Sequence, residues 1–103
     1  MDWIYLLVAG LLEVAWAVGL KFTDGFTRWW PSLWVGVGMV ISIACLSLAL
    51  RSIPVGTGYA VWTGIGAVGT AILGMILFQE PATLTRVVCI LLIVSGIVGL
   101  RLF

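Results

Sequence analysis

The sequence predicts an all-α membrane protein with four transmembrane helices, and three observations support this prediction. Of the 103 residues, 63% are hydrophobic and only 9% are charged. The mean hydropathy is +1.28, and a soluble domain of this size could not bury so much apolar surface. The few charged residues also divide the chain into four apolar runs. Lipid is therefore the expected solvent for most of the side chains.

The four apolar runs set the expected helix boundaries. A helix needs about 20 apolar residues to cross a bilayer, and three runs reach that length or nearly so. The fourth has only 14 residues between Arg86 and Arg101, but Arg86 can snorkel, so this helix can start near Ala82. One domain spanning residues 1–103 is expected, with helices at about 3–20, 29–50, 53–79 and 82–102.

The first run is expected to be a spanning helix and not a cleaved signal peptide. Ala15-Trp16-Ala17 fits a cleavage pattern, but the start of the chain is acidic, and Glu13 would lie just before the cut. Nothing indicates metal, cofactor or nucleic-acid binding, because the net charge is +1 and histidine is absent. Cys45 and Cys89 lie far apart in apolar runs, where packing is their expected role.

The distribution of positive charge leaves the orientation in the membrane weakly specified. The end that holds the N-terminus, the loop between helices 2 and 3 and the C-terminus carries Arg51 and Arg101. The other end carries Lys21, Arg28 and Arg86. Since Lys and Arg bias sets orientation, the chain either adopts one weakly preferred topology or inserts both ways round. The second reading predicts an antiparallel homodimer of oppositely inserted copies.

A dimer also fits the size of the chain, because four helices leave little interior for a solute path. The fourth run presents small residues at spacings of seven and four, which let helices approach closely. They serve either a dimer interface or packing within one subunit. The candidate dimer-packing residues are Cys89, Ser95, Gly96 and Gly99.

Glu13 is the only charged residue between Trp3 and Leu20. It lies about 15 Å along the helix from Trp3, near the middle of the bilayer. A charge there costs at least about 2.5–3.5 kcal/mol, so an intramembrane carboxylate is a functional-site candidate. The alternative is an inert, protonated glutamate inside the bundle.

The residues expected near Glu13 suit an organic cation. Gly10 and Trp16 share its helix face and offer space and an aromatic wall. Ser42 is the strongly polar side chain well inside the second run, and Tyr59 and Trp62 share one face of the third. A carboxylate with aromatic rings in a dry site favours charge pairing and cation–π contact. Packing or an interfacial position is the alternative role for these residues.

The third run also contains a glycine pattern, G-x-G-x-x-G, over residues 64–69. A dinucleotide site is not expected, because the pattern lies inside a membrane run with no preceding strand. In a spanning helix, Gly64 and Gly66 are expected to permit close packing or a bend.

The chain resembles the small multidrug resistance family of transporters over essentially its whole length, and within it the guanidinium-exporter branch. The stretches that carry the resemblance are "EVAWAVGLKFTDGFTRWWPS" and "IPVGTGYAVWTGIGAVG". Gly58 departs from the expected alanine. The resemblance implies a multi-pass inner-membrane antiporter, not an enzyme, working as an antiparallel homodimer that exchanges protons for a guanidinium-type cation.

The resemblance also implies roles for individual residues. Glu13 from both subunits would be the shared proton and substrate site, and the glycines at 64–66 would mark a bend in helix 3. Trp16, Ser42, Tyr59 and Trp62 would line the pocket. The alternatives are a broad exporter of quaternary ammonium or aromatic cations, a small-cation channel, or a non-transporting subunit of a larger membrane complex.

Overall fold

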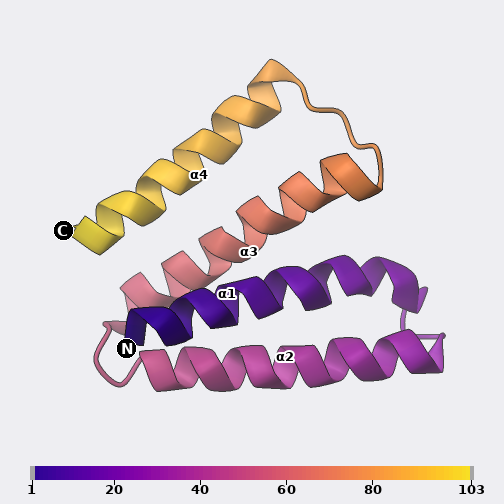
Figure 1. Cartoon of the computed structure of the whole chain (residues 1–103), viewed down its shortest axis with the longest axis horizontal. Coiled ribbons are helices and arrows are strands. Elements are labelled where there is room, and N and C mark those ends of the chain that lie inside the picture. The colour runs from indigo at the N-terminus through magenta and orange to yellow at the C-terminus, as the bar shows by residue number, and fades with distance from the viewer. Residues whose placement is uncertain (1, 103) are drawn as a thin grey trace.

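In a computed structural model, which describes residues 2–102, the chain forms four long helices and one short 3₁₀ helix (Figure 1). All four long helices are long and apolar enough to cross a membrane. The prediction of an all-α chain with four transmembrane helices is therefore confirmed, and the chain is a multi-pass membrane protein. The elements are α1 (Asp2–Gly19), η1 (Leu20–Thr23), α2 (Trp29–Ala49), α3 (Val55–Leu77) and α4 (Leu84–Leu102).

Backbone conformation marks several of the helix boundaries. After η1, the backbone takes positive φ angles at Asp24, Gly25 and Phe26, and this turns the chain back towards α2. Pro54 precedes the first residue of α3, a place where proline is well tolerated. Gln79 has a φ of 55°, which cannot continue a right-handed helix. The helical segments are consequently shorter than some of the runs that encode them.

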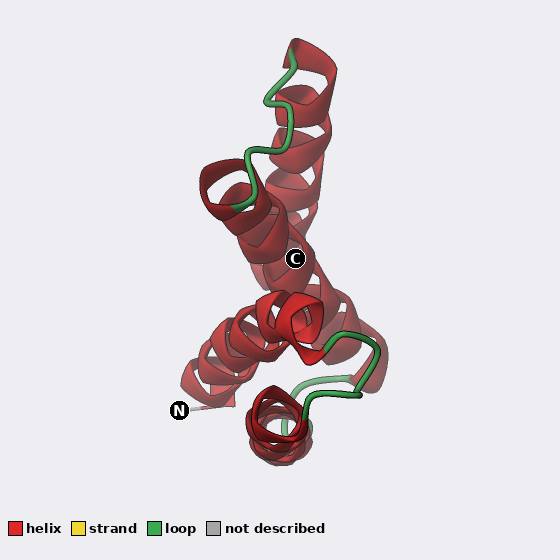
Figure 2. Cartoon of the chain, turned by 90° about the vertical axis from the view of Figure 1, so that its right-hand side faces the viewer, coloured by secondary structure: helices red, strands yellow, loops and turns green. Residues whose placement is uncertain are grey.

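The helices do not form a closed four-helix bundle. α1 packs against both α2 and α3, whereas α2 and α3 have little contact with each other. The backbone of α4 packs only against α3. Figure 2, turned by 90°, shows the α3–α4 hairpin extending away from the α1–α2 pair. The centre of packing is therefore α1, and α4 lies at the periphery.

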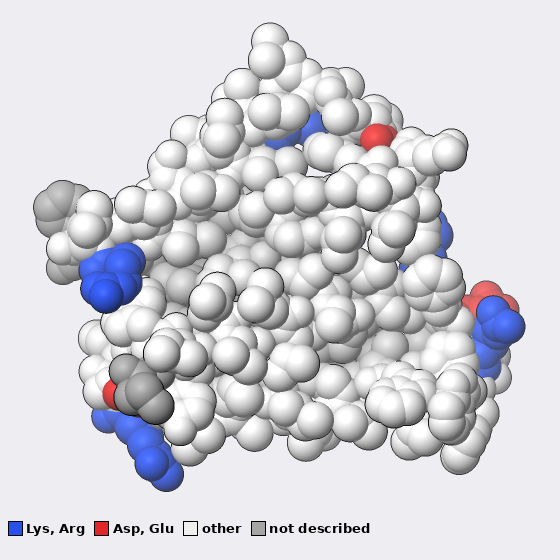
Figure 3. All heavy atoms as spheres, viewed as in Figure 1, with Lys and Arg blue, Asp and Glu red and all other residues white. Residues whose placement is uncertain are grey.

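The buried core is small and lies towards the end of the molecule that holds the loop between α2 and α3. Its members come from the first three helices and that loop, and among the described residues α4 contributes none. On the face shown in Figure 3, charged side chains gather near the ends of the helices, and the surface between them carries no Lys, Arg, Asp or Glu. The core consists of Leu6, Ala9, Leu46, Ala49, Ile53, Val61 and Trp62.

Candidate functional site

The candidate site lies along the contact between α1 and α3, which we call the α1–α3 seam. Glycines on both helices set the register of this contact. A Cβ atom on Gly10 would come within 2.6 Å of Ile65, and one on Gly69 would overlap Val14. Only glycine leaves room for these side chains, so the two backbones approach closely. The two helices also run in the same direction (Figure 1).

Glu13 projects from α1 into this seam and lies against Gly66 of α3. A Cβ atom on Gly66 would overlap the Glu13 carboxylate group. Because Gly66 has no side chain, it leaves the space that the carboxylate group occupies. Glu13 Oε1 is buried and has no hydrogen-bond partner among residues 2–102. The helices therefore hold a carboxylate oxygen away from every donor that the described chain could offer.

Ser42, Tyr59 and Trp62 form one connected cluster, which we call the aromatic cluster. The Ser42 hydroxyl group donates to the Ala9 carbonyl oxygen at 2.7 Å. It accepts from the Trp62 indole Nε1 at 3.1 Å. The rings of Tyr59 and Trp62 lie 5.5 Å apart, centroid to centroid. Ser42 is fully buried and Trp62 is 8% exposed, whereas Tyr59 is 56% exposed. The cluster therefore reaches from the core to the surface.

The aromatic cluster lies one helical turn from Glu13 along the same seam. Ala9 precedes Glu13 by four residues on α1, and Trp62 precedes Gly66 by four residues on α3. Residues at this spacing lie above one another on one helix face. The hydrogen bonds of Ser42 reach Ala9 and Trp62, so Ser42 acts here on the tryptophan and not directly on the carboxylate.

Trp16 and Gly10 occupy other parts of the α1 surface. A Cβ atom on Gly38 of α2 would lie 3.3 Å from the Trp16 Cβ atom. Trp16 also lines a groove of about 450 Å³ between α1 and α2, together with Trp34. Its Nε1 atom is buried and has no partner among the described residues. Trp16 thus faces α2, whereas Glu13 and Gly10 face α3.

Gly64 and Gly66 allow neighbouring helices to pack closely on α3. The helix continues through both residues, from Val55 to Leu77. Gly64 faces Ile97 of α4, and a Cβ atom there would lie 2.9 Å from the isoleucine Cδ1 atom. The sequence predicted that these glycines permit either close packing or a bend. Close packing has a structural basis at both positions, and the bend in helix 3 stays a prediction.

The candidate dimer-packing residues of α4 make few contacts within the described chain. Cys89 is exposed, and the Ser95 hydroxyl group bonds to the Leu91 carbonyl oxygen of its own helix at 2.8 Å. A Cβ atom on Gly96 or Gly99 would meet nothing within 4 Å. These residues remain available to another helix, and their role in a dimer stays a prediction.

The arrangement has the chemistry of a site that accepts one positive charge. A carboxylate in an apolar environment is costly without a partner, so Glu13 must take up either a proton or a cation. Trp62 presents an aromatic ring one turn away and Tyr59 one turn beyond it, and aromatic faces attract cations. No three side chains of the metal-binding types come together within residues 2–102.

Sequence reasoning did not connect Glu13 with the residue of α3 that adjoins it. Gly66 was assigned to a bend or to general packing, whereas it adjoins the carboxylate. Thr70 lies one turn further along α3, and its Oγ1 atom is buried without a partner among the described residues. Both residues belong to one stripe on α3, at positions four apart. That spacing was visible in the sequence, but the helix that faces the stripe was not.

Comparisons with known proteins agree on one family. The family model described as Small Multidrug Resistance protein matches residues 1–93. A guanidinium exporter from Citrobacter freundii is 60% identical over 102 residues, covering 99% of this chain and 97% of the relative. A guanidinium exporter from Salmonella typhi is 59% identical over the same shares of the two chains. One from Proteus vulgaris is 56% identical over 99% of this chain and 98% of the relative.

Gly66→Ala should weaken binding of guanidinium, the cation expected from the sequence, by about tenfold while the protein still folds. The new methyl group would overlap the end of a flexible side chain, so Glu13 would move away at little cost to packing, and a displaced group loses its binding geometry. Gly56→Ala in the same helix meets open space and serves as the control. Equal calorimetric affinities of the two variants would contradict this geometry.

Ser42→Ala should lower the free energy of unfolding by about 1–2 kcal/mol, because it leaves the buried Trp62 N–H without an acceptor. Ser47 of the same helix is exposed, so Ser47→Ala should change stability little. The measurement is unfolding in detergent, monitored by tryptophan fluorescence. If the two variants have the same stability, the Ser42–Trp62 hydrogen bond does not stabilise the fold.

Proposed function

Because this chain belongs to the small multidrug resistance protein family, we propose that it exports guanidinium and small guanidinyl cations in exchange for protons. The observation that carries the proposal is the Glu13 carboxylate group, held in the α1–α3 seam without a partner among the described residues. The relatives named guanidinium exporters support the choice of cation. In this proposal the chain is a carrier of the bacterial inner membrane and catalyses no covalent chemistry.

Guanidinium matches the groups that the site offers. It is planar and carries N–H donors around its edge, so one carboxylate can accept two parallel hydrogen bonds from it. Its flat faces stack on aromatic rings. Trp62 offers such a ring one turn from Glu13 and Tyr59 one turn beyond it, and Ser42 holds the Trp62 indole in position through a hydrogen bond. Trp16 is proposed to enter the pocket from the α2 side.

Proton coupling follows from competition for a single carboxylate. When a guanidinium ion binds, it compensates the charge of Glu13, and any proton on that group must leave. When the cation leaves into a dry site, the uncompensated carboxylate is costly again and takes up a proton. Provided that the empty, charged site does not readily switch sides, the two flows are linked in opposite directions.

The working unit is proposed to be an antiparallel homodimer with one Glu13 from each copy. Three features of the single chain support this. Glu13 is only partly buried, α4 contributes no buried side chain in the described range, and Gly96 and Gly99 face open space. A second copy would cover these surfaces. Exchange of the roles of the two copies would then open the site to alternate sides of the membrane.

Export of larger aromatic or quaternary ammonium cations is the second candidate function. The observation that favours it is the apolar groove of about 450 Å³ beside Trp16, which could receive a bulky cation. Proton flux driven by each substrate in liposomes separates the two functions. Guanidinium should drive the larger flux, whereas equal flux with tetraphenylphosphonium would favour the broader exporter. Guanidinium flux without proton movement would indicate a channel.

Glu13→Gln should abolish guanidinium-driven proton flux and the release of protons on guanidinium binding. Glutamine fills the same space but does not titrate, so the protein should remain folded. In the unmodified protein, guanidinium binding should weaken as the pH falls, because protonated Glu13 no longer attracts a cation. Calorimetry in two buffers of different ionisation enthalpy measures the released protons. Asp24→Asn, at an exposed turn residue, is the control, and proton-coupled transport by Glu13→Gln would refute the mechanism.

Two added lysines in the loop between α1 and α2, or at the C-terminus, should lock the chain in opposite orientations. The native charges give only three positive side chains against two, so a small addition is expected to decide the orientation. Each locked form should be inactive alone, and co-expression should restore guanidinium resistance in cells. Full activity of one locked form by itself would contradict the antiparallel dimer.

A further inference from the structure

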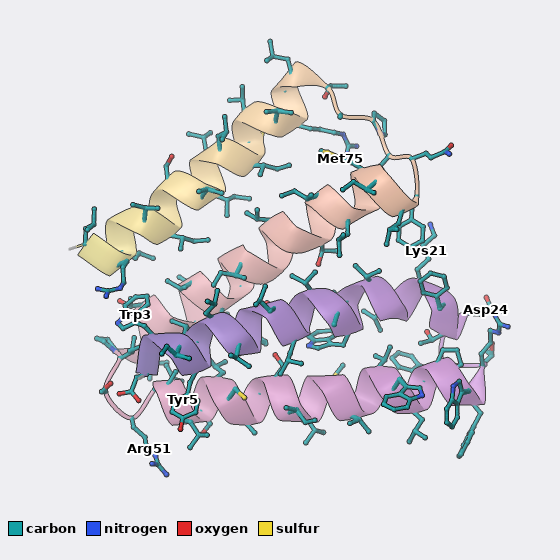
Figure 4. All side chains as sticks on the ribbon, in the orientation of Figure 1. Trp3, Tyr5, Lys21, Asp24, Arg51 and Met75 are labelled. Carbon is teal, nitrogen blue, oxygen red and sulfur yellow. The ribbon has the colours of Figure 1, made fainter. Side chains whose placement is uncertain are left out.

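We propose a second, outer binding site for the guanidinium ion at the far end of the α1–α3 seam, formed by Thr70, Phe78 and Glu80. This inference rests on the proposed function, since it adds a transient binding site on the path of the same cation. The site is a hollow of about 180 Å³, bounded by Ala17 of α1, by Lys21 of η1 and by Thr70, Gly74, Phe78 and Glu80. Figure 4 shows Lys21 at this end of the seam, beside the end of α3.

The Glu80 carboxylate group is held over the C-terminal end of α3. The positive φ of Gln79 turns the chain back on itself, and the Glu80 backbone N–H donates to the Gly74 carbonyl oxygen at 3.3 Å. A Cβ atom on Gly74 would lie 2.8 Å from Glu80 Oε1. Glu80 thus fits against Gly74 in the same way that Glu13 fits against Gly66.

The electrostatic environment of the hollow favours a cation. The C-terminal end of a helix carries a partial negative charge from its unpaired carbonyl groups. The Glu80 carboxylate adds a full negative charge at the same place, which is unfavourable unless a positive charge is close by. Lys21 supplies one such charge, and a bound guanidinium ion would supply another. The hollow therefore combines a carboxylate with the negative end of a helix.

The other walls of the hollow offer the remaining contacts. The Phe78 ring already makes a cation–π contact, because Lys21 Nζ lies 5.1 Å from the ring centroid. Thr70 Oγ1 is buried without a partner among the described residues, so it is free to accept from a guanidinium N–H. The hollow thus offers a cation a carboxylate, an aromatic ring and a hydroxyl group with no partner among the described residues.

The register of the seam places this hollow on a straight path from Glu13. Thr70 and Gly74 follow Gly66 at steps of four on α3, and at the same steps Glu13 is followed by Ala17 on α1 and Lys21 in η1. Eight residues of α-helix rise about 12 Å, so the hollow lies that far from Glu13 towards the membrane surface. A guanidinium ion that leaves Glu13 along the seam would meet Thr70 and then Glu80. In the proposed antiparallel dimer, each membrane face would hold one outer site.

The two charged residues of the hollow should have opposite effects on transport. Glu80 attracts the cation, so Glu80→Gln should raise KM for guanidinium about three- to tenfold, as expected for one lost and partly screened charge contact. Lys21 repels the cation and covers Phe78, so Lys21→Gln should lower KM. In both variants kcat should stay within about twofold, because Glu13 is untouched. The double variant should return towards the unmodified KM.

The test is guanidinium-driven proton flux in liposomes, with KM and kcat measured for each variant. Asp24→Asn and Arg28→Gln remove one charge of each sign at the same end of the molecule but outside the hollow, and neither should alter KM. Thr70→Val should raise KM, and Thr70→Ser should restore it by returning the hydroxyl group.

The proposal is overturned if Glu80→Gln behaves like Asp24→Asn, or if Glu80→Gln and Lys21→Gln both raise KM, as a purely structural role would require. Absence of guanidinium transport by the unmodified protein would instead overturn the proposed function itself. If Glu80→Gln fails to fold, the Lys21→Gln and Thr70 variants decide the question, because an unchanged KM in all of them refutes the outer site.

Discussion

The close approach of α1 and α3 is the constraint on which the rest of the structure depends. Gly10 and Gly69 bring the two backbones together by leaving room for Ile65 and Val14. In lipid there is little hydrophobic driving force between helices, so tight van der Waals contact has to hold them. This contact places Glu13 against Gly66 and the aromatic cluster one turn away. A side chain at either glycine would separate the helices and disperse the site.

The packing of α1 on α3 also explains why the carboxylate has no partner. Helix backbones satisfy their own hydrogen bonds, and Gly66, which lies against Glu13 across the seam, has no side chain to donate one. The strongly polar Ser42 is occupied by Ala9 and Trp62. Glu13 therefore remains available to a mobile cation or proton, whereas Ser42 serves to hold the tryptophan. The hydrogen bonds of Ser42 are thus part of the fold, whereas the partner of Glu13 can be exchanged.

The sequence predicted the four helices and the unusual position of Glu13 better than it predicted which side chains of different helices contact each other. Apolar length and isolated charges are properties of one segment, so they reveal spans and an unusual carboxylate directly. Which residues of another helix a given face contacts depends on how the two helices are aligned along each other. The sequence of a single run does not determine that alignment. This is why Gly66 was taken as a bend or packing residue although it adjoins Glu13, and why the contact of Trp16 with α2 was not foreseen. The aromatic cluster of Ser42, Tyr59 and Trp62 is a partial exception, because few other polar or aromatic side chains lie inside those helices.

The two glutamates that adjoin α3 illustrate how one packing rule produces two different environments. Glu13 and Glu80 each lie against a glycine, at Gly66 and Gly74, but they differ in depth. At mid-membrane the surroundings are apolar, so the charge of Glu13 must be compensated whenever it is present. At the helix end, Glu80 is exposed and Lys21 lines the same hollow, so a negative charge is less costly there. A deep carboxylate suits exchange between a proton and a cation, whereas a shallow one suits capture of a cation from water. The same glycine stripe on α3 thus provides both positions along one path.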